Sequence, residues 1–405
     1  MKILLIHNKY KEAGGEDAVF QAEADLLARN RNIVETMVFD NGDIKTYWDK
    51  LLSGLRVIYN PVSARQLESK VHEFDPEIIH VHNFVPLASP SIFFVAKRYR
   101  IPVVLTLHNF RLICPSATLF HKNEIYEKST RSVFPLGAVI KGVYRDSILQ
   151  TAAVALMTAV HSVIGTWKNR IALYVALTSF ARKKFMDSAI GIPENKLVVK
   201  QNFIRDCGRG EIGRQDYYLF VGRLTEEKGI RTLLEATLLS DFKLVIIGEG
   251  PLSNVVTEAA KESSRITYLG FQDKSAVIAH MKRCKGLIFP SLWYEGLPIT
   301  LLEALCCGTI VIASKLGSMA EIIEHGFNGL HFQAGNAKDL VSRIDEVNAN
   351  PGYFKSLSAK ARLTYLENYT PEKNYSMLMN IYNRALTTVR KGQESVVYKP
   401  VQQGW

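Results

Sequence analysis

The chain has 405 residues, of which 47% are hydrophobic and 22% are charged. This length predicts two or three domains with well-filled cores, and the composition excludes a chain that is disordered along most of its length. The formal net charge is +11, and the excess is concentrated in residues 97–205, which hold 17 Lys and Arg against 5 Asp and Glu. Such a segment favours an anionic partner, either a nucleic acid or an anionic membrane surface, although a solvated face without a partner explains the charge equally well.

Five cysteines occur and none forms a Cys-x-x-Cys pair, so we expect neither a disulfide framework nor a thiolate zinc site. The first residues, MKILLIHNKYK, contain an apolar run that is too short for a signal peptide and is better explained as a first β-strand. A reducing compartment suits both observations. We therefore expect a cytoplasmic protein, with contact at the inner membrane surface left open.

Short aliphatic and β-branched runs alternate with helical patterns along the chain. The predicted strands are residues 2–7, 33–39, 77–82, 102–108, 171–178 and 196–203 in the first half, and 217–222, 243–248, 266–270, 286–290, 309–313 and 329–332 in the second. Strands that are apolar throughout and alternate with helices indicate parallel sheets covered on both faces. The polar, glycine-containing residues 205–216 separate the two groups. We expect an α/β fold of two Rossmann-like doubly wound parallel-sheet domains that face each other across a cleft, with ligands at the carboxyl ends of the strands.

Residues 147–165 depart from this pattern because they contain no Asp, Glu, Lys or Arg. A membrane span of this length is conceivable. Gln150, His161 and four Ser or Thr residues make it a poor one. A core helix, or a helix lying at a membrane interface, is therefore favoured over a span.

A pair of glycines, Gly14 and Gly15, follows the first predicted strand and opens a helical pattern. Backbone amides at such a position can hold a phosphate or a sugar, although a Gly-Gly pair is more often a flexible loop. The strand at 77–82 carries His80 and His82, which alternate onto one face as metal ligands would. No nearby Asp or Glu completes a ligand set, so we favour a lining of the acceptor side. The residues expected there are His82, Asn83 and Asn109.

The loop VGRLTEEKG at 221–229 follows a predicted strand and contains Arg223 and Lys228. Arginine offers a bidentate fork and lysine a point charge, a combination that suits a diphosphate. For either residue alone, a surface salt bridge is the more common role.

The segment EGLPITLLE at 295–303 follows the strand at 286–290. Pro298 suits the first position of a helix, so free amides at a helix N-terminus are expected to face the cleft and to favour an anion. Glu295 and Glu303 flank this position and suit hydroxyl-rich groups on either side of a phosphate. The alternative is that Glu295 is an ordinary acid at a helix N-terminus and Glu303 belongs to a solvated face.

Together these motifs resemble those of the family 4 retaining glycosyltransferases. The shared features are the E-x7-E pair, the loop at 221–229, IGEGPL at 247–252 and EHGFNG at 324–329. The resemblance covers nearly the whole second half and, more loosely, the first. It implies the B-type glycosyltransferase fold and transfer of a sugar from a nucleotide diphosphate donor. It also implies an acceptor domain at residues 1–205 with a helical segment at about 111–170, a nucleotide-sugar-binding domain at 206–380, and a helix end with a loose tail at 381–405, the tail beginning near Lys391.

The resemblance also implies roles for the residues that match its motifs. Glu295 would bond the hydroxyls of the donor sugar, and His108, after the strand at 102–108, would contact the transferred sugar, although a structural histidine is the alternative. Both are the expected catalytic residues. The expected donor-binding residues are Gly14, Gly15, Arg223, Lys228, Gly296, Leu297, Pro298 and Glu303, with Glu303 on the ribose and Arg223 and Lys228 on the diphosphate.

No Asp-x-Asp triple occurs, so we expect no metal and no cofactor. Arg223, Lys228 and the helix N-terminus would then neutralise the leaving diphosphate. The resemblance implies retention, with same-face attack in which the leaving phosphate helps to deprotonate the acceptor. The chain departs from its relatives at Lys315 to Ser318, where a Gly-Gly pair is common, and we expect a tolerated change near the sugar.

The leading hypothesis is therefore a glycosyltransferase of cell-surface polysaccharide biosynthesis that acts on a glycan or lipid-linked acceptor, in peripheral contact with an anionic membrane and without nucleic acid. A sugar-phosphate phosphorylase or a nucleotide-sugar epimerase of the same fold is one alternative. A non-enzymatic basic protein that binds nucleic acid is another. Its one compact candidate is the run from Arg182 to Phe185, RKKF.

Overall fold

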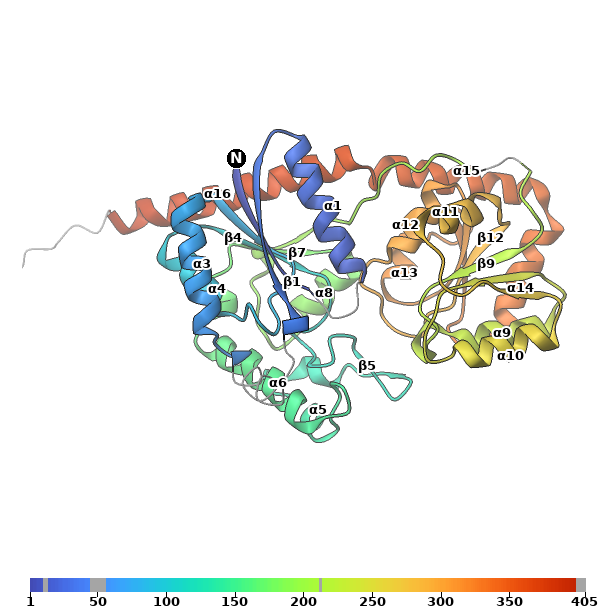
Figure 1. Ribbon diagram of the computed structural model, residues 1–405, viewed down its shortest axis with the longest axis horizontal. Coiled ribbons are helices and arrows are strands. Elements are labelled where there is room, and N and C mark those ends of the chain that lie inside the picture. The colour runs from blue at the N-terminus through green and yellow to red at the C-terminus, as the bar shows by residue number, and fades with distance from the viewer. Residues whose placement is uncertain (10–13, 44–55, 211–212, 398–405) are drawn as a thin grey trace, which may run out of the picture.

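The computed structural model describes residues 1–9, 14–43, 56–210 and 213–397. Two six-stranded parallel sheets form two lobes, with strand orders β2-β1-β3-β4-β7-β8 and β11-β10-β9-β12-β13-β14 (Figure 1). The strands of the first lobe are β1 Lys2–Lys9, β2 Ile33–Asp40, β3 Ile78–Val81, β4 Val103–Leu107, β7 Leu173–Ala176 and β8 Leu197–Val199. Those of the second are β9 Tyr218–Val221, β10 Leu244–Ile247, β11 Ile266–Tyr268, β12 Gly286–Phe289, β13 Ile310–Ser314 and β14 Gly329–Phe332. Each overlaps one of the predicted runs, and the expectation of two Rossmann-like sheets is confirmed.

Helices cover both faces of each sheet, as the apolar strands require. In the first lobe they are α1 Gly15–Arg29, α3 Pro61–Phe74, α4 Ser91–Arg98, α5 Leu136–Ile140, α6 Ile148–Val163, α7 Thr166–Asn169 and α8 Ser179–Met186. In the second they are α9 Ile230–Leu239, α10 Ser253–Glu262, α11 Lys274–Arg283, α12 Ile299–Cys306, α13 Gly317–Ile322, α14 Ala337–Ala349 and α15 Pro351–Asn368. Short 3-10 turns occur at Asn41–Asp43, Lys128–Arg131, Glu194–Lys196 and Glu226–Lys228. Of the described residues, no helix combines the length and the apolar character that crossing a bilayer needs.

The central strands of each sheet are fully buried because both of their faces are covered. In the first lobe, Ile3 and Leu5 face one layer of helices while Leu4 and Ile6 face the other, and all four are 0% exposed. The second sheet has the same two-sided core around β9 and β12. The parallel register brings the carboxyl ends of neighbouring strands to one edge of each sheet, where the loops of the candidate site begin.

An insertion between β4 and β7 contains the short antiparallel pair β5 Phe120–His121 and β6 Glu124–Ile125 together with α5, α6 and α7. The first part of this insertion reaches the second lobe. The ring of Phe120 lies 6.4 Å from that of Trp293, and Glu127 pairs with Lys184 and hydrogen-bonds Tyr294. The helical segment expected at about residues 111–170 is therefore an insertion with three helices and one short antiparallel pair, and its first part contacts the second lobe.

The last helix, α16 Pro371–Val397, returns from the second lobe and runs along the first (Figure 1). Its Leu378 and Tyr382 are buried in the same core cluster as Ile3 and Leu5. The helix continues past Lys391, where the loose tail was expected to begin, and ends at Val397; residues 398–405 lie outside the described part. A helix that began as part of the second lobe thus completes the core of the first.

The two lobes also meet where α13 approaches α8. The Glu321 carboxylate accepts hydrogen bonds from the backbone amides of Ser179 and Phe180 at 2.8 and 2.7 Å, which caps the N-terminus of α8. A polar cavity of about 300 Å³ lies beside this contact and shares no lining residue with the candidate site described below.

Candidate functional site

Glu295 lies in the loop between β12 and α12, and its carboxylate is held from two sides. Its Oε1 accepts a hydrogen bond from Lys228 Nζ at 2.7 Å and from Ser291 Oγ at 2.7 Å. The hydroxyl of Ser318 donates to the Glu295 backbone carbonyl at 2.8 Å. Glu295 is only 8% exposed, so the loop is fixed rather than solvated. The structure therefore brings together Glu295 and Lys228, two residues from separate loops that the sequence motifs had assigned to one site.

Lys228 follows β9 and lies against aromatic rings as well as against Glu295. Its Nζ is 5.3 Å from the centre of the Trp293 ring and 5.7 Å from that of Phe289, distances at which a cation is attracted to a ring face. Gly229 next to it has φ of +74°, and a Cβ there would lie 1.9 Å from the Pro290 carbonyl oxygen. Only glycine permits this approach, which places the loop after β9 beside the loop after β12. Arg223 belongs to the same loop, at the carboxyl end of β9.

Helix α12 begins one residue later than expected, because Pro298 is its N-cap with extended backbone and Ile299 is the first helical residue. The free amides at this helix N-terminus still follow Glu295 directly. Leu297 is 6% exposed and packs in the core, so only its backbone can approach a ligand. Glu303 is 7% exposed and pairs with Lys274 at 3.0 Å. The alternative in which Glu303 belongs to a solvated face is therefore wrong.

The two lobes meet at Gly296 and His108. A Cβ built on Gly296 would lie 2.6 Å from the His108 backbone oxygen, so the loop before α12 rests directly on the end of β4. This contact places the expected catalytic pair, His108 and Glu295, on opposite sides of one interface between the sheets. A small cavity of about 30 Å³ lies at the end of β4, and His82, Asn83, His108 and Asn109 are among the residues that line it.

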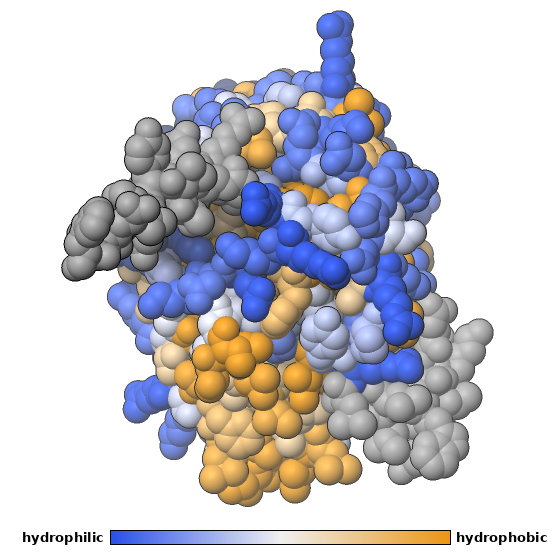
Figure 2. Space-filling model, turned by 90° about the vertical axis from the view of Figure 1, so that its left-hand side faces the viewer, coloured by the Kyte–Doolittle hydropathy of each residue, from blue (hydrophilic) through white to orange (hydrophobic). Residues whose placement is uncertain are grey.

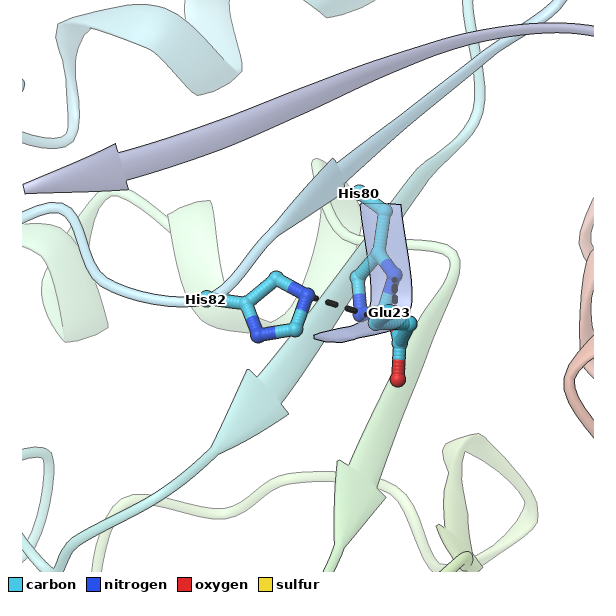
Figure 3. Close-up of side chains that lie close together, drawn as sticks. All are labelled: Glu23, His80 and His82. Carbon is cyan, nitrogen blue, oxygen red and sulfur yellow. Dashed lines mark ion pairs between the residues drawn. The ribbon is translucent and has the colours of Figure 1, made fainter. Parts of the chain in front are cut away.

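A buried series of polar groups leads away from His108 into the first lobe, and Figure 3 shows three of its members, Glu23, His80 and His82. His108 Nε2 lies 3.0 Å from His82 Nδ1, and His82 Nε2 lies 3.3 Å from Glu23 Oε1 on α1. His80 Nδ1 is 3.0 Å from the same oxygen, while Lys200 Nζ is 2.7 Å from Glu23 Oε2. Glu23 and Lys200 are each 1% exposed. The expectation that no Asp or Glu stands near the two histidines is therefore wrong, because α1 supplies Glu23.

Burial and the neighbouring charges determine how these groups ionise. Burial alone would raise the pKa of Glu23, but the Lys200 ammonium, followed by His80 and His82, outweighs it and holds that pKa well below its usual range. Burial lowers the pKa of His82 to about 4 and holds the pKa of His108 well below its ordinary value. Both histidines are therefore neutral near pH 7 while Glu23 is ionised.

The facing nitrogens of His82 and His108 lie at hydrogen-bond distance, so one of them carries a proton and the other accepts it. His82 Nε2 lies 3.3 Å from Glu23 Oε1 without forming a hydrogen bond to it. When a neutral His82 is protonated on Nε2, its Nδ1 accepts from His108 Nε2–H, and His108 Nδ1 is left as an acceptor.

Glu23, His80 and His82 are, among the described residues, the group with the spacing of a metal site, since their ligand atoms lie within 4.8 Å of one another. The surroundings fit an ion pair better. The Lys200 ammonium already forms an ion pair with the Glu23 carboxylate. Both ring nitrogens of His80 already lie within hydrogen-bond distance of hydroxyls, Tyr382 Oη at 2.8 Å and Thr106 Oγ1 at 2.7 Å. A cation placed between these groups would be repelled by Lys200.

Gly14 and Gly15 lie where α1 begins. Gly14 is the N-cap, and its amide donates to Asp17 Oδ2 at 2.8 Å. A Cβ at Gly15 would meet no atom of the described residues within 4 Å. Asn109 donates to Glu16 Oε1 at 2.9 Å, which ties the start of α1 to the end of β4. The glycines thus lie on the same edge of the first sheet as His108.

Asn83 has a structural role that the sequence did not predict. Its side chain donates to the Asn8 carbonyl oxygen at 2.8 Å and accepts from the Val85 amide at 3.1 Å. Both contacts hold the loop after β3.

The run from Arg182 to Phe185 lies on α8 and is neutralised by neighbouring acids. Arg182 pairs with Glu194 at 3.0 Å, Lys183 with Asp187 at 2.9 Å, and Lys184 with Glu127 at 2.5 Å. Each of the three cations in this run therefore has a carboxylate partner.

The sequence motifs did not identify four residues that contact the expected site residues: Ser291, Ser318, Glu23 and Lys200. Ser291 follows a predicted strand and lies four residues before Glu295, so its position held a signal. Ser318 was noted only as a departure. Glu23 and Lys200 lie far from His82 along the chain, and only the folded arrangement of α1 and β8 brings them to it.

Two family models together match most of the chain. The model "Glycosyltransferase Family 4" matches residues 49–205, and "Glycosyl transferases group 1" matches residues 208–380. The boundary between the matches lies in the stretch that separates the two sheets.

Several known proteins are similar. An uncharacterized glycosyltransferase of Methanocaldococcus jannaschii is 30% identical over 52% of this chain and 60% of its own length. A second one from that organism is matched over 48% of its length, so the chain spans less than two thirds of both. The N-acetyl-alpha-D-glucosaminyl L-malate synthase of Bacillus anthracis is 20% identical over 83% of this chain and 82% of its own. The O-antigen chain mannosyltransferase C of Escherichia coli is 26% identical over 53% and 59%.

Among solved structures, Anabaena HepE in complex with UDP superposes with a TM-score of 0.68 at 17% identity, covering 94% of this chain and 99% of that one. The sucrose-phosphate synthase of Thermosynechococcus elongatus gives 0.68 at 15% identity, covering 95% and 99%. At these identities the likeness shows the fold, which is the expected B-type arrangement of two lobes.

Proposed function

Because the chain belongs to the family 4 glycosyltransferases, we propose that it transfers a sugar from a nucleoside diphosphate sugar to an acceptor hydroxyl with retention of anomeric configuration. The observation that carries the proposal is the pairing of Lys228 with Glu295 just before α12, in a loop whose next residue, Gly296, lies against the His108 backbone. A cation, a carboxylate and free helix amides in one place suit the phosphate and the sugar of a single donor.

The donor is placed with its diphosphate on the second lobe. Lys228 and Arg223 face the phosphates together with the α12 amides, Glu295 binds hydroxyls of the sugar, and Glu303, buried on α12, binds the ribose. The Lys228–Glu295 pair supports this placement, because it holds the phosphate-binding cation and the sugar-binding carboxylate within one hydrogen bond of each other.

In the transfer step, the acceptor oxygen forms a bond to the anomeric carbon as the bond from that carbon to the phosphate oxygen breaks. The acceptor proton passes to the leaving diphosphate on the same face. Lys228, Arg223 and the α12 amides stabilise the charge that develops on the diphosphate, without a metal ion. His108, neutral and fixed by His82, offers an acceptor nitrogen to the sugar and leaves the reacting carbon without a competing proton donor.

The acceptor is placed at the first lobe, as a glycan or a lipid-linked glycan of polysaccharide or glycolipid synthesis. The printed functions of relatives support this class, since they include an O-antigen mannosyltransferase and a phosphatidyl-myo-inositol mannosyltransferase. The insertion after β4 supports it as well, because that segment contacts Trp293 and Tyr294 of the second lobe.

The test is a panel of nucleotide sugars incubated with the protein, with EDTA and without acceptor or phosphate, followed by assays with candidate acceptors. We expect one donor to be hydrolysed slowly without acceptor and its sugar to be transferred faster when an acceptor is present. We expect NMR of the product to show the same anomeric configuration as in the donor. Sugar release that requires inorganic phosphate would indicate a phosphorylase, and isomerisation of the donor without acceptor would indicate an epimerase. Either result, or a strict need for a divalent metal, would contradict the proposal.

A further inference from the structure

Helix α6 carries large apolar side chains on the face that it turns to solvent. Leu149 and Val163 are 83% and 84% exposed, and Ile148, Leu156 and Ile164 are exposed as well. No Asp, Glu, Lys or Arg occurs in the helix. A surface helix in water has a polar outer face, so a helix that is apolar on its buried and exposed sides requires a second apolar environment.

Helix α5, which packs against α6, extends the same surface. Leu136 is 58% exposed and Ile140 67%, and Phe134 just before the helix is 40% exposed. Figure 2 shows apolar side chains gathered at the lower end of the molecule, with hydrophilic ones along their upper edge. We call this surface the α5–α6 face; its members are Phe134, Leu136, Ile140, Ile148, Leu149, Leu156, Val163 and Ile164.

Exposed cations flank the α5–α6 face. Lys141 directly follows α5, Arg145 precedes α6, and Lys168 lies in α7 just beyond it; all three are exposed. Lys128 and Arg131 are exposed in the preceding turn, whereas Asp146 is the single acid between residues 128 and 170. This arrangement of an apolar centre with cations around it matches the acyl region and the anionic headgroups of a lipid leaflet.

We propose that the α5–α6 face docks on an anionic lipid bilayer. Leu149 and Val163 enter the acyl boundary, α6 lies in the plane of the interface, and Lys141, Arg145 and Lys168 contact lipid phosphates. A protein partner would also cover apolar side chains, but the lysines favour lipid, because protein interfaces contain less lysine than the rest of a protein surface.

The inference rests on the proposed function and deepens it, because the insertion that carries the face also contacts the second lobe. Phe120 contacts the Trp293 ring, and Glu127 joins Lys184 and Tyr294 across the lobes. A lipid-linked acceptor held in the same leaflet would thus approach the first lobe beside His108. The docking is measured without donor or acceptor, so its failure and a failure of the transfer activity are distinguishable.

The experiment is co-sedimentation of the full chain with vesicles of phosphatidylcholine alone and of phosphatidylcholine with phosphatidylglycerol. We expect binding to the anionic vesicles that weakens with salt, and a fall of roughly tenfold or more in the partition coefficient for the double variant Leu149→Asp, Val163→Asp. A matched double variant, Leu238→Asp with Phe271→Asp, removes side chains that are 78% and 72% exposed on the second lobe and is expected to bind as the wild type does.

Circular dichroism melting checks that each variant is folded. If the apolar double variant does not fold, Lys141→Glu with Arg145→Glu tests the same face through its charge, and we expect a similar loss on anionic vesicles only. The proposal is overturned if the wild type does not bind anionic vesicles, or if the variants of the face bind them undiminished. It is also overturned if light scattering shows that the wild type is a dimer which Leu149→Asp dissociates, because the face would then be an interface between copies.

Discussion

Gly296 rests against the backbone oxygen of His108, so closely that a Cβ on Gly296 would lie 2.6 Å from that oxygen. The contact joins the loop before α12 to the end of β4 and sets how the two lobes meet at the candidate site. It also explains why a glycine follows Glu295, since any side chain would force the lobes apart.

The first prediction concerns this contact. Gly296→Ala is expected to lower kcat by on the order of tenfold or more while each lobe keeps its fold, because a displacement near 1 Å is enough to misplace reacting groups. Gly213→Ala is the matched control, since Gly213 lies in the segment between the lobes and a Cβ there meets no atom of the described residues within 4 Å. Steady-state kinetics and thermal melting measure both. Unchanged kcat in Gly296→Ala would show that the contact has no part in catalysis.

The second prediction concerns Glu295. Glu295→Gln keeps the shape of the side chain but removes the negative charge of the carboxylate that accepts hydrogen bonds from Lys228 and Ser291. We expect a loss of about a hundredfold or more in kcat, comparable to the removal of one stabilising group from a preorganised site, with melting changed little. Glu258→Gln is the control, because Glu258 is an exposed partner of Lys261 on the same lobe. Full activity in Glu295→Gln would remove Glu295 from the mechanism.

The third prediction concerns Glu23. Glu23→Gln leaves the buried Lys200 ammonium without its carboxylate, and breaking a buried pair in this way costs about 3–5 kcal/mol of unfolding free energy. Asp25→Asn, on the same helix, breaks an exposed pair with Arg205 and is expected to cost less than about 1 kcal/mol. Urea denaturation compares the two. Equal losses would show that Lys200 and Glu23 are solvated in the protein.

The fourth prediction is a dependence of stability on pH. The folded pKa of His82 is lowered to about 4 by burial, below the value near 6.5 of an unfolded chain, so the unfolded state binds more protons between these values. Stability is therefore fully present above pH 6.5 and falls as the pH drops toward 4, by on the order of 1 kcal/mol per pH unit for this histidine. His108 changes in the same direction.

Unfolding free energies measured from pH 7 to pH 4 test this, with His82→Gln as the comparison. The variant is expected to show a shallower slope over that range, whatever its stability at pH 7. A slope identical to that of the wild type would mean that His82 is not held neutral in the fold.

The sequence was sufficient to predict both sheets, because strands buried on two faces are apolar along their whole length. The runs at 2–7 and 286–290, for example, coincide with β1 and β12. It was also sufficient to predict that Lys228 and Glu295 share a site, because loops that follow parallel strands meet at one sheet edge. The hydrogen bond between them confirms that proximity.

Other features depend on tertiary contacts that no local pattern encodes. Glu23 has the position of an ordinary charged residue on an amphipathic helix, and nothing near it in the sequence indicates that it turns inward to His82 and Lys200. Tyr382 likewise meets His80 only because α16 returns to the first lobe. The predicted start of α12 was wrong by one residue, because proline is compatible with both the N-cap and the first helical position.

The most direct measurement is isothermal titration calorimetry of nucleoside diphosphates in the presence of EDTA. It compares the wild-type protein with Lys228→Met and with the control Lys261→Met. The Lys261 side chain is 67% exposed, and Lys261 is distant from Glu295 in the sequence. We predict that one nucleoside diphosphate binds the wild type and Lys261→Met equally and binds Lys228→Met at least about tenfold more weakly, since a charge-assisted hydrogen bond to phosphate is lost. Equal affinity in all three proteins, or binding only after a divalent metal is added, would contradict the donor site described here.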